Sequence, residues 1–312
     1  MLEAIVQGVL LGGYYAVIAA GLSLMLGVVR FINLAHGDLA VLGAYLALAA
    51  IAFLGLPVWW AFALVLPVMA GIGWGLQRFL FARTLEGGFL LPLLATFGLG
   101  AVLQNGMQGI FGSETRSLAN YMGNLSWAGW QLPFGLYVGV LPVLTFAAAV
   151  IVLGGLQVML SFTKIGRAMR ATSTDPEAAE LQGVDARRVQ RVATAIAFML
   201  AGLAGMFLAM RAQVTPYAGP AQLIFAFQAV IIGGIGSLWG TLIGGIALGV
   251  AQSLGASISA QWFQLAGHFL FFVVLAIRMS SAGPTRERVL VWFDRIADAL
   301  RLRTRGERKH AD

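Results

Sequence analysis

The sequence predicts an all-α membrane protein that crosses the bilayer eight or nine times, with broken or re-entrant helices among its spans. Three observations carry this fold class: 59% of the 312 residues are hydrophobic, only 11% are charged, and the charges are clustered. A soluble domain usually has about a quarter charged residues. A spanning helix needs about 20 apolar residues, so the charge-free stretches hold about nine crossings. These stretches are residues 4–29, 39–77, 87–113, 117–163, 192–210 and 212–277.

The positions of Lys and Arg predict the orientation in the membrane. The first residues contain Glu3 and no Lys or Arg, so residues 5–28 are interpreted as a first span with its amino end outside, not as a signal peptide. With nine alternating crossings, eighteen of the twenty Lys and Arg residues fall on the cytoplasmic side, and only Arg116 and Arg211 fall outside. Cytoplasmic loops carry such an excess. The net charge of +7 is therefore assigned to orientation and not to nucleic-acid binding.

We expect two regions in the chain. Residues 1–283 form the transmembrane domain, which includes a short inner loop over 78–88, an external segment over 112–135 and a cytoplasmic loop over 161–191. Residues 284–312 form a basic amphipathic cytoplasmic tail, in which apolar residues recur at helical spacing among arginines. This pattern indicates a helix on the anionic inner leaflet of membrane lipid, with a partner-binding helix as the alternative.

Glycines interrupt the apolar stretch 221–258. To place the basic residues inside, this stretch either crosses twice as two short helices or enters the membrane and returns. Both arrangements leave non-helical backbone near Gly233–Ser237 at membrane depth, where it must be buried in protein or line a wet cavity. A second Gly-containing break lies near 33–43. Paired breaks in the two halves of a chain point to a transport path between them, although glycine is common in membrane helices generally.

Ionisable residues within the first break are the main candidates for chemistry. Asp38 is the one acidic residue placed near the membrane interior, and His36 lies two positions before it. Intramembrane ionisable residues are functional candidates because of their insertion cost. The alternative is a solvated position at the inner interface, with Asp38 at a helix start. The candidate translocation-path residues are Asn33, His36, Gly37, Asp38, Gly233, Gly234, Gly236 and Ser237.

The sequence contains no recognisable catalytic set. The three histidines are scattered, no Gly-x-Ser-x-Gly, His-Glu-x-x-His or Walker pattern occurs, and Cys is absent. We therefore expect neither an enzyme nor a cofactor or metal site.

The cytoplasmic loop 161–191 contains the signals of a short capped helix. Asp175 suits the N-cap, Pro176 the first helical position and Glu177 the first turn. Good helix formers follow in Ala178, Ala179 and Glu180, and Gly183 can end the helix in the left-handed conformation. A deliberately capped helix in a minimal loop suggests a docking surface; a solvated connector is the alternative.

Three motifs, taken in order, resemble one family. The first is Asn33–Asp38 with Leu42-Gly43-Ala44-Tyr45. The second is Gly166-Arg167-Ala168-Met169-Arg170-Ala171 with Asp175–Ala179 and Gly183-Val184-Asp185. The third is Gly233–Gly240 with Gly244-Gly245. Together they are similar to the branched-chain amino-acid (LivH-type) permeases of ABC importers. The resemblance runs from the first span to the last and leaves the tail beyond about 284 unmatched.

This resemblance implies a subunit of a bacterial inner-membrane importer for branched-chain or related amino acids. It implies cytoplasmic ATP-binding subunits, a second, homologous permease and a periplasmic substrate-binding protein as partners. The helix Asp175–Gly183 would then be the coupling helix on which an ATPase sits. From the residues alone, an ion-coupled secondary transporter that uses Asp38 and His36 stays open, as does a channel or structural subunit.

Overall fold

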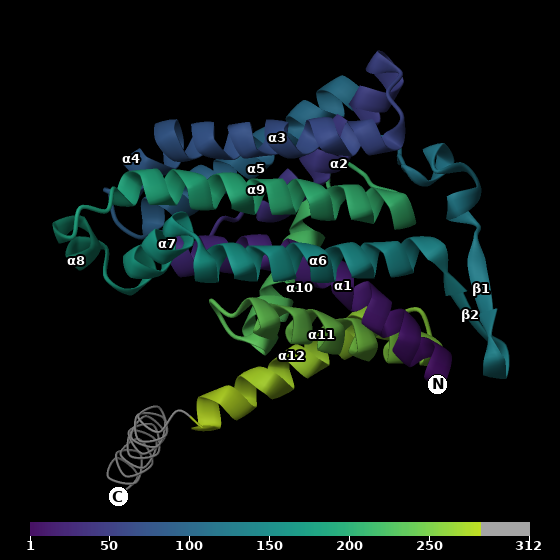
Figure 1. The fold of residues 1–312 in the computed structure, drawn as a ribbon. Coiled ribbons are helices and arrows are strands. Elements are labelled where there is room, and N and C mark those ends of the chain that lie inside the picture. Colours follow the sequence, from purple (N-terminus) through teal and green to yellow (C-terminus); the bar gives the residue numbers. More distant parts are fainter. Residues whose placement is uncertain (282–312) are drawn as a thin grey trace, which may run out of the picture. The chain divides into compact units, whose positions relative to one another are not determined.

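Residues 1–281 are described by a computed structural model (Figure 1). The predicted amphipathic tail, 284–312, lies outside the described residues. The chain divides into two compact units at His268, and the arrangement below concerns the first, Met1–His268. The second begins at Phe269, and its described part is the end of α12. The longer helices are α1 (Leu2–Leu24), α2 (His36–Leu54), α3 (Val58–Leu76), α5 (Leu90–Phe111), α6 (Val140–Phe162), α9 (Ala186–Arg211), α10 (Gly219–Gly233), α11 (Leu238–Ile258) and α12 (Trp262–Ser281).

Shorter elements extend or connect these helices. The π-helical turn η1 (Met25–Val29) continues α1, and η2 (Gln77–Phe81) with α4 (Ala82–Leu85) continues α3. Helices α7 (Lys164–Thr174) and α8 (Pro176–Leu181) lie between α6 and α9. Three 3₁₀ turns, Ala119–Tyr121, Gly123–Ser126 and Pro133–Gly135, accompany the antiparallel strands β1 (Gly129–Leu132) and β2 (Leu136–Gly139), in which Gly129 pairs with Gly139 and Leu132 with Leu136.

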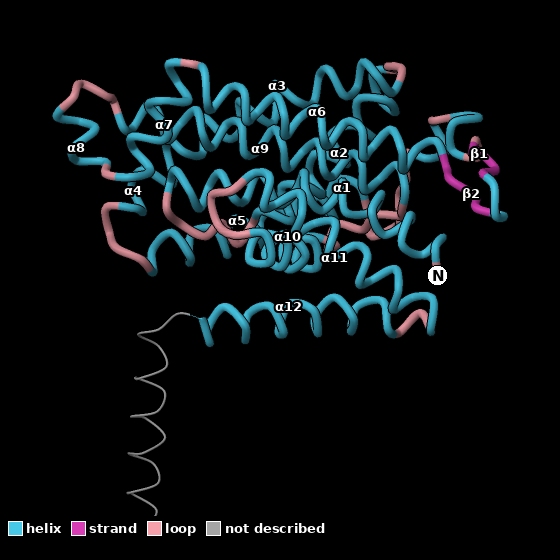
Figure 2. Tube along the Cα trace, turned by 60° about the horizontal axis from the view of Figure 1, so that its bottom comes forward, coloured by secondary structure: helices cyan, strands magenta, loops and turns pink. Residues whose placement is uncertain are grey.

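The predicted fold class is confirmed. Eight helices within residues 1–281 are long and apolar enough to cross a membrane, and α10 is a shorter apolar helix of 15 residues. The β1–β2 hairpin was not predicted, because its four-residue strands leave no long alternating pattern. The hairpin and α8 lie at opposite ends of the helical bundle, and the amino terminus lies at the hairpin end (Figures 1 and 2).

Helix α1 forms the centre of the bundle, with 89% of its spanning window buried. It packs antiparallel against α11 through glycines. A Cβ on Gly12 would lie 2.4 Å from the Cα of Ile246, and one on Gly249 would lie 2.3 Å from the carbonyl oxygen of Gly8. Small residues let membrane helices approach this closely, and close van der Waals packing is what holds such helices together. The α1–α11 contact is therefore a backbone-to-backbone contact.

The stretch 221–258 consists of two antiparallel helices of unequal length. Helix α10 spans only about 22 Å at 1.5 Å per residue, whereas α11 has 21 residues and is a candidate span. The predicted non-helical break is present between them. Gly234 and Gly236 have φ values of 98° and 83°, which favour glycine. Gly233 and Gly240 are so close that a Cβ on Gly233 would lie 2.0 Å from the Gly240 carbonyl oxygen.

Two predicted loops are shorter than expected. Residues 78–85 are helical, because no Gly or Pro interrupts them before Gly87, so the predicted inner loop 78–88 reduces to the turn after Leu85. The loop 161–191 also contains α7, and α9 begins at Ala186 with the Asp185 carboxylate accepting from the Arg188 N–H. Charged residues thus lie on helical extensions beyond the apolar spans.

We expect Gly12→Ala to lower the free energy of unfolding by about 1–3 kcal/mol, because the added methyl group must separate α1 from α11. The matched control is Gly71→Ala in α3, where no atom lies within 4 Å of the new Cβ. That change should be neutral or stabilising by up to about 1 kcal/mol, since Ala is the better helix former. Thermal unfolding of the purified protein in detergent measures both, and equal midpoints would contradict the tight α1–α11 contact.

Candidate functional site

The short helix predicted in the loop 161–191 is present as α8 (Pro176–Leu181). The Asp175 carboxylate accepts hydrogen bonds from the backbone N–H groups of Glu177 and Ala178, both at 3.1 Å. Pro176 occupies the first helical position. Two of the free donors at the helix start are thus satisfied by one side chain.

The other end of α8 closes in a Schellman arrangement. Gly183 has φ of 80°, its N–H donates to the Glu180 carbonyl at 2.9 Å, and the Val184 N–H donates to the Ala179 carbonyl at 3.1 Å. Ending a helix in this way needs a left-handed residue, which glycine provides. Both ends of this six-residue helix are therefore fixed by its own sequence.

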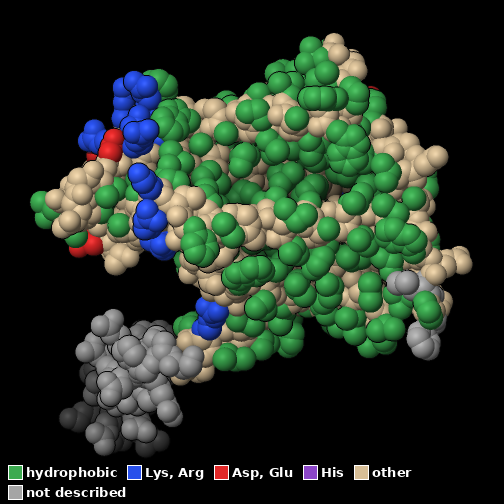
Figure 3. All heavy atoms as spheres, viewed as in Figure 1, with side chains coloured by type: hydrophobic (Ala, Val, Ile, Leu, Met, Phe, Trp, Pro, Cys, Tyr) green, Lys and Arg blue, Asp and Glu red, His purple; other side chains and the backbone are tan. Residues whose placement is uncertain are grey.

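Helix α8 presents an acidic and apolar surface. Ala179 is buried, whereas Glu177, Ala178 and Glu180 are exposed and Leu181 is 87% exposed. Lys and Arg side chains gather at the same end of the bundle (Figure 3). An exposed large apolar side chain between carboxylates, on a helix with capped ends, is suited to contact with another protein.

The first predicted path motif, Asn33–Asp38, folds back into the bundle after α1. Asn33 and His36 are completely buried. The Asn33 side-chain oxygen accepts from the Ala35 N–H at 3.1 Å, and His36 Nε2 lies 2.9 Å from the Ile18 carbonyl oxygen in the middle of α1. Ile18 precedes Arg30 by twelve residues, which is about 18 Å along a helix. His36 therefore lies deep in the bundle.

Asp38 lies in the first turn of α2 and is only 3% exposed. The solvated position at the inner interface is therefore wrong, while the placement at a helix start is correct. Asp38 does not act as the N-cap; that position is Ala35, which makes no side-chain capping bond.

The Asp38 carboxylate occupies space that two glycines leave free. A Cβ on Gly219, the first residue of α10, would lie 1.9 Å from Asp38 Oδ1, and one on Gly100 of α5 would lie 2.7 Å from Oδ2. The Gln104 side-chain amide donates to Oδ1 at 2.8 Å. Asp38 also lies in the first turn of α2 and beside Gly219, the first residue of α10, where the dipole of each helix favours a negative charge. These contacts offset the cost of burying it.

Gly37 makes the approach between α2 and α10 possible. A Cβ on Gly37 would lie 1.9 Å from the Gly219 carbonyl oxygen. The first motif thus contacts the start of α10 through both Gly37 and Asp38.

The second predicted path motif, Gly233–Ser237, forms the break after α10. The Gly236 N–H donates to Ser23 Oγ at 3.2 Å, and Ser237 Oγ accepts from the Gly240 N–H at 3.0 Å as the N-cap of α11. Gly233 and Gly234 are half-buried, and Gly236 and Ser237 are exposed. The structure does not bring the two motifs into direct contact, but α10 joins them, because it begins against one and ends at the other.

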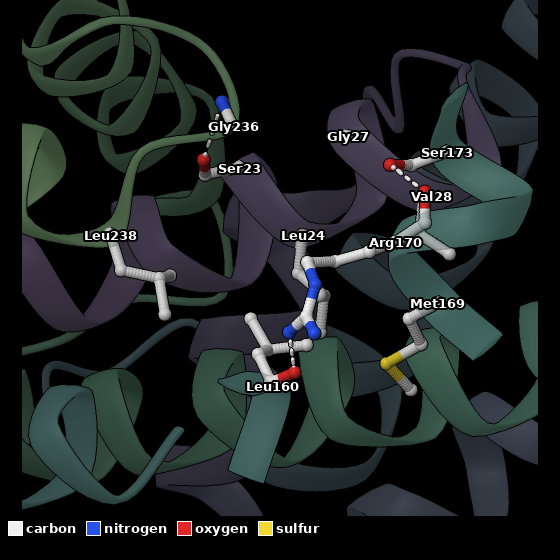
Figure 4. A pocket seen from close by; sticks show the side chains of 10 residues that line it. All are labelled: Ser23, Leu24, Gly27, Val28, Leu160, Met169, Arg170, Ser173, Gly236 and Leu238. Atoms are coloured by element: carbon white, nitrogen blue, oxygen red, sulfur yellow. Dashed lines mark hydrogen bonds between the residues drawn. The ribbon is translucent and has the colours of Figure 1, made fainter. Parts of the chain in front are cut away.

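A small pocket of about 100 Å³ lies beside this break (Figure 4). It is bounded by the inner end of α1 with η1, the end of α6, helix α7 and the α10–α11 turn. Ser23 and Gly236 lie on one side, and Met169 and Arg170 of α7 on the other. Helix α7, which leads into α8, is therefore adjacent to the second motif.

Sequence analysis missed a set of polar contacts between α1, α10, α11 and α12. The hydroxyls of Tyr14 and Tyr15 donate to the side-chain oxygens of Gln222 and Gln252, and the Gln228 amide contacts His268 Nδ1, each at 2.5 Å. Glutamines and tyrosines within charge-free stretches were the available signal, because polar side chains inside a membrane bundle need partners.

Comparison with known proteins identifies the family. The family model for the permease component of branched-chain amino acid transport systems matches residues 4–278. The chain is 29% identical to the high-affinity branched-chain amino acid permease protein BraD of Pseudomonas aeruginosa, over 89% of this chain and 94% of the relative. It is 27% identical to LivH of Escherichia coli K12, over 88% and 93%. It is 30% identical to a probable LivH of Methanocaldococcus jannaschii, over 76% and 75%.

No solved structure gives a significant match to this chain. The family match nevertheless covers both candidate motifs and all eight candidate spans, apart from the first two residues of the first span and the last two of the last. The fold, the capped loop helix and the sequence comparisons agree: this multi-pass membrane protein belongs to the branched-chain amino acid permease family of ABC transport systems.

Proposed function

We propose that this chain is the importer subunit that passes branched-chain or closely related amino acids across the bacterial inner membrane, energised by ATPase subunits that dock on α8. The observation that carries the proposal is the capped, exposed surface of α8 at the basic end of a protein of this family. The relatives are named as permeases for branched-chain amino acids, which supports the substrate class.

The proposed orientation places α8 in the cytoplasm. Lys and Arg side chains gather at this end of the bundle (Figure 3), as the positive-inside rule requires of a cytoplasmic face. The β1–β2 hairpin and the amino terminus, at the opposite end, then face the periplasm and are placed to meet a substrate-binding protein.

The proposed path follows α10. Gly37 and Asp38 lie against its start, and Asn33 and His36 immediately precede them in the chain. The second motif, Gly233, Gly234, Gly236 and Ser237, lies at its end. Asn33 Nδ2 and His36 Nδ1 are buried without a hydrogen-bond partner, which is unusual for buried polar atoms. A zwitterionic amino acid offers a carboxylate for the Asn33 amide and an ammonium group for Asp38. The ammonium group also suits His36 Nδ1, which is an acceptor because His36 Nε2 donates to the Ile18 carbonyl.

A second, homologous permease completes the proposed assembly. Only 22% of the spanning windows of α5 and α6 is buried within this chain, so their apolar faces are left for lipid or for another subunit. Asn105 lies on the exposed face of α5 next to Ala101, whose carbonyl accepts from its amide at 2.7 Å. An exposed amide within a span is better accommodated against protein than against lipid tails.

The ion-coupled alternative based on Asp38 and His36 is set aside. The relatives are permease proteins of multi-component transport systems, and His36 is already engaged by the Ile18 carbonyl.

We expect mild solubilisation of this protein from its native membrane to recover ATP-binding subunits and a second permease, because the α8 surface and the α5 face are built for contact. Mass spectrometry identifies what is recovered. In proteoliposomes with those partners and the binding protein, uptake of radiolabelled leucine should require ATP. Uptake by this chain alone, driven by a proton gradient without ATP, would overturn the proposal.

Charge reversal on α8 should uncouple transport. Glu177→Lys with Glu180→Lys reverses the charge of its exposed surface without touching the cap residues Asp175 and Gly183, so the permease still inserts. We expect uptake to fall at least tenfold, equivalent to about 1.4 kcal/mol. The control is Glu114→Lys on the external segment, which should transport normally. Wild-type uptake by the double variant, at equal membrane levels, would show that α8 is only a connector.

Removing the charge of Asp38 should impair uptake without unfolding the protein. Asparagine keeps the volume of Asp38 and an acceptor for the Gln104 amide, but it cannot pair with a substrate ammonium group. We expect Asp38→Asn to lower the rate of uptake at least tenfold, with a detergent melting temperature close to that of wild type. The same carboxylate-to-amide change at the exposed Glu114 serves as control. Normal uptake by Asp38→Asn would exclude Asp38 from the path.

A further inference from the structure

Arg30 ties the cytoplasmic loop to the inner end of α1. One of its terminal guanidinium nitrogens donates to the carbonyl oxygens of Ser173 at 2.6 Å and Thr174 at 2.9 Å. These are the last two residues of α7, and the last carbonyls of a helix have no partner within that helix. A cation at this end also suits the helix dipole. Thr174 is followed directly by Asp175, the N-cap of α8.

The backbone of Arg30 is unusual. With φ of 64°, it is the one non-glycine residue of the described chain in the left-handed region. This conformation ends η1, and the Arg30 N–H donates to the Met25 carbonyl at 3.0 Å. Glycine adopts it without steric cost, whereas other residues do so only where the surroundings hold them there. We therefore expect the contacts of the Arg30 side chain to offset the cost of this backbone conformation.

The residues after Arg30 connect it to the first path motif and contact neighbouring helices on the way. Phe31 is buried against Phe81, with ring centroids 5.1 Å apart, and the Leu34 N–H donates to Thr96 Oγ1 at 3.2 Å. The chain then reaches His36, whose ring contacts the Ile18 carbonyl. Five residues, 31–35, thus separate the loop contact at Arg30 from the start of α2.

Helix α7 is otherwise attached to the bundle by a few side chains. Met169 and Thr172 are completely buried. The pocket described above separates Arg170 and Ser173 from Ser23 and Gly236 (Figure 4). The Arg170 guanidinium contacts the Leu160 carbonyl of α6 instead. Within the described residues, the two hydrogen bonds of the Arg30 guanidinium are therefore the polar contact between the end of α7 and the turn that follows α1 and η1.

We infer that Arg30 is a positioning residue that transmits displacement of α8 to the start of α2, and so couples the ATPase-docking surface to the Asn33–Asp38 motif. This inference rests on the proposed function. When α8 moves, the Ser173 and Thr174 carbonyls move with it, and the guanidinium carries that movement into residues 31–36. Contacts at Phe81 and Thr96 pass it to α3 and α5.

The decisive variant is Arg30→Gly, because glycine relieves the left-handed backbone while deleting the guanidinium. Arg30→Lys keeps a cation with several donors, but its side chain is shorter and has no planar guanidinium, so its ammonium group does not reach the position of the nitrogen that donates here. Arg78→Gln is the matched control, since Arg78 lies at the inner end of α3 and stacks on the Phe79 ring rather than on the loop.

The assembled complex in proteoliposomes measures the coupling as leucine taken up per ATP hydrolysed. We expect this ratio to fall at least tenfold in Arg30→Gly, while the ATPase subunits still co-purify and still hydrolyse ATP. Arg30→Lys should give an intermediate ratio, and Arg78→Gln the wild-type ratio. A wild-type ratio in Arg30→Gly would overturn the inference, and so would loss of the ATPase subunits, which would make Arg30 an assembly residue.

Hydrogen exchange of the full chain in detergent separates this inference from the proposed function. In Arg30→Gly, amides of residues 31–36 and of the end of α7 should exchange faster together, while those of α9 and α11 stay unchanged. Faster exchange in α7 alone would show that the contact transmits nothing to α2 and would overturn the link even in a protein with normal transport. Uptake by the wild-type protein without ATP would overturn the proposed function. The exchange result would then still show whether Arg30 links the end of α7 to the start of α2.

Discussion

The structure depends on the backbone-to-backbone packing of α1 in the centre of the bundle. Its contact with α11 leaves no room for side chains at Gly8, Gly12, Gly245 or Gly249, so the position of α1 relative to α11 is fixed. All the functional regions attach to it at successive positions along its length. Ile18 holds His36, Ser23 holds Gly236, and the turn that follows Val29 holds the end of α7. Each of these regions can therefore move relative to the others only by changing its contact with α1 or with the turn that follows it.

Broken helices explain how a carboxylate is tolerated at this depth. An unbroken pair of spans at α2 and α10 would present only apolar side chains and satisfied backbone groups to Asp38. Because both helices begin close to Asp38, the first turn of α2, the first residue of α10 and the Gln104 amide lie next to the carboxylate instead. The glycines at 100 and 219 supply the space, so the polar site and the helix breaks are one feature of the fold.

The spans and α8 could be predicted from the sequence because their signals are local. Charge-free stretches set the length of each span, and Asp175, Pro176 and Gly183 specify both ends of α8 within nine residues. The depth of His36 and Asp38 could not be predicted, since it depends on where the chain folds back after Arg30. The partners of Tyr14 and Tyr15 are more than 200 positions away, so no local pattern identifies them. The β1–β2 hairpin was missed because strands of four residues are too short to show a period.

The π-helical turn at Met25–Val29 sets the direction in which the chain leaves the carboxyl-terminal end of α1. A π-turn follows i→i+5 hydrogen bonding and so holds about one residue more than an α-turn, and one residue corresponds to about 100° of rotation around a helix. The Arg30 side chain therefore points in a different direction from the one it would have at the end of a regular α-helix. Deleting one residue between Met25 and Arg30 would therefore restore a regular α-helix. The Arg30 side chain would then rotate around the helix axis, and its guanidinium would point away from the carbonyls of α7.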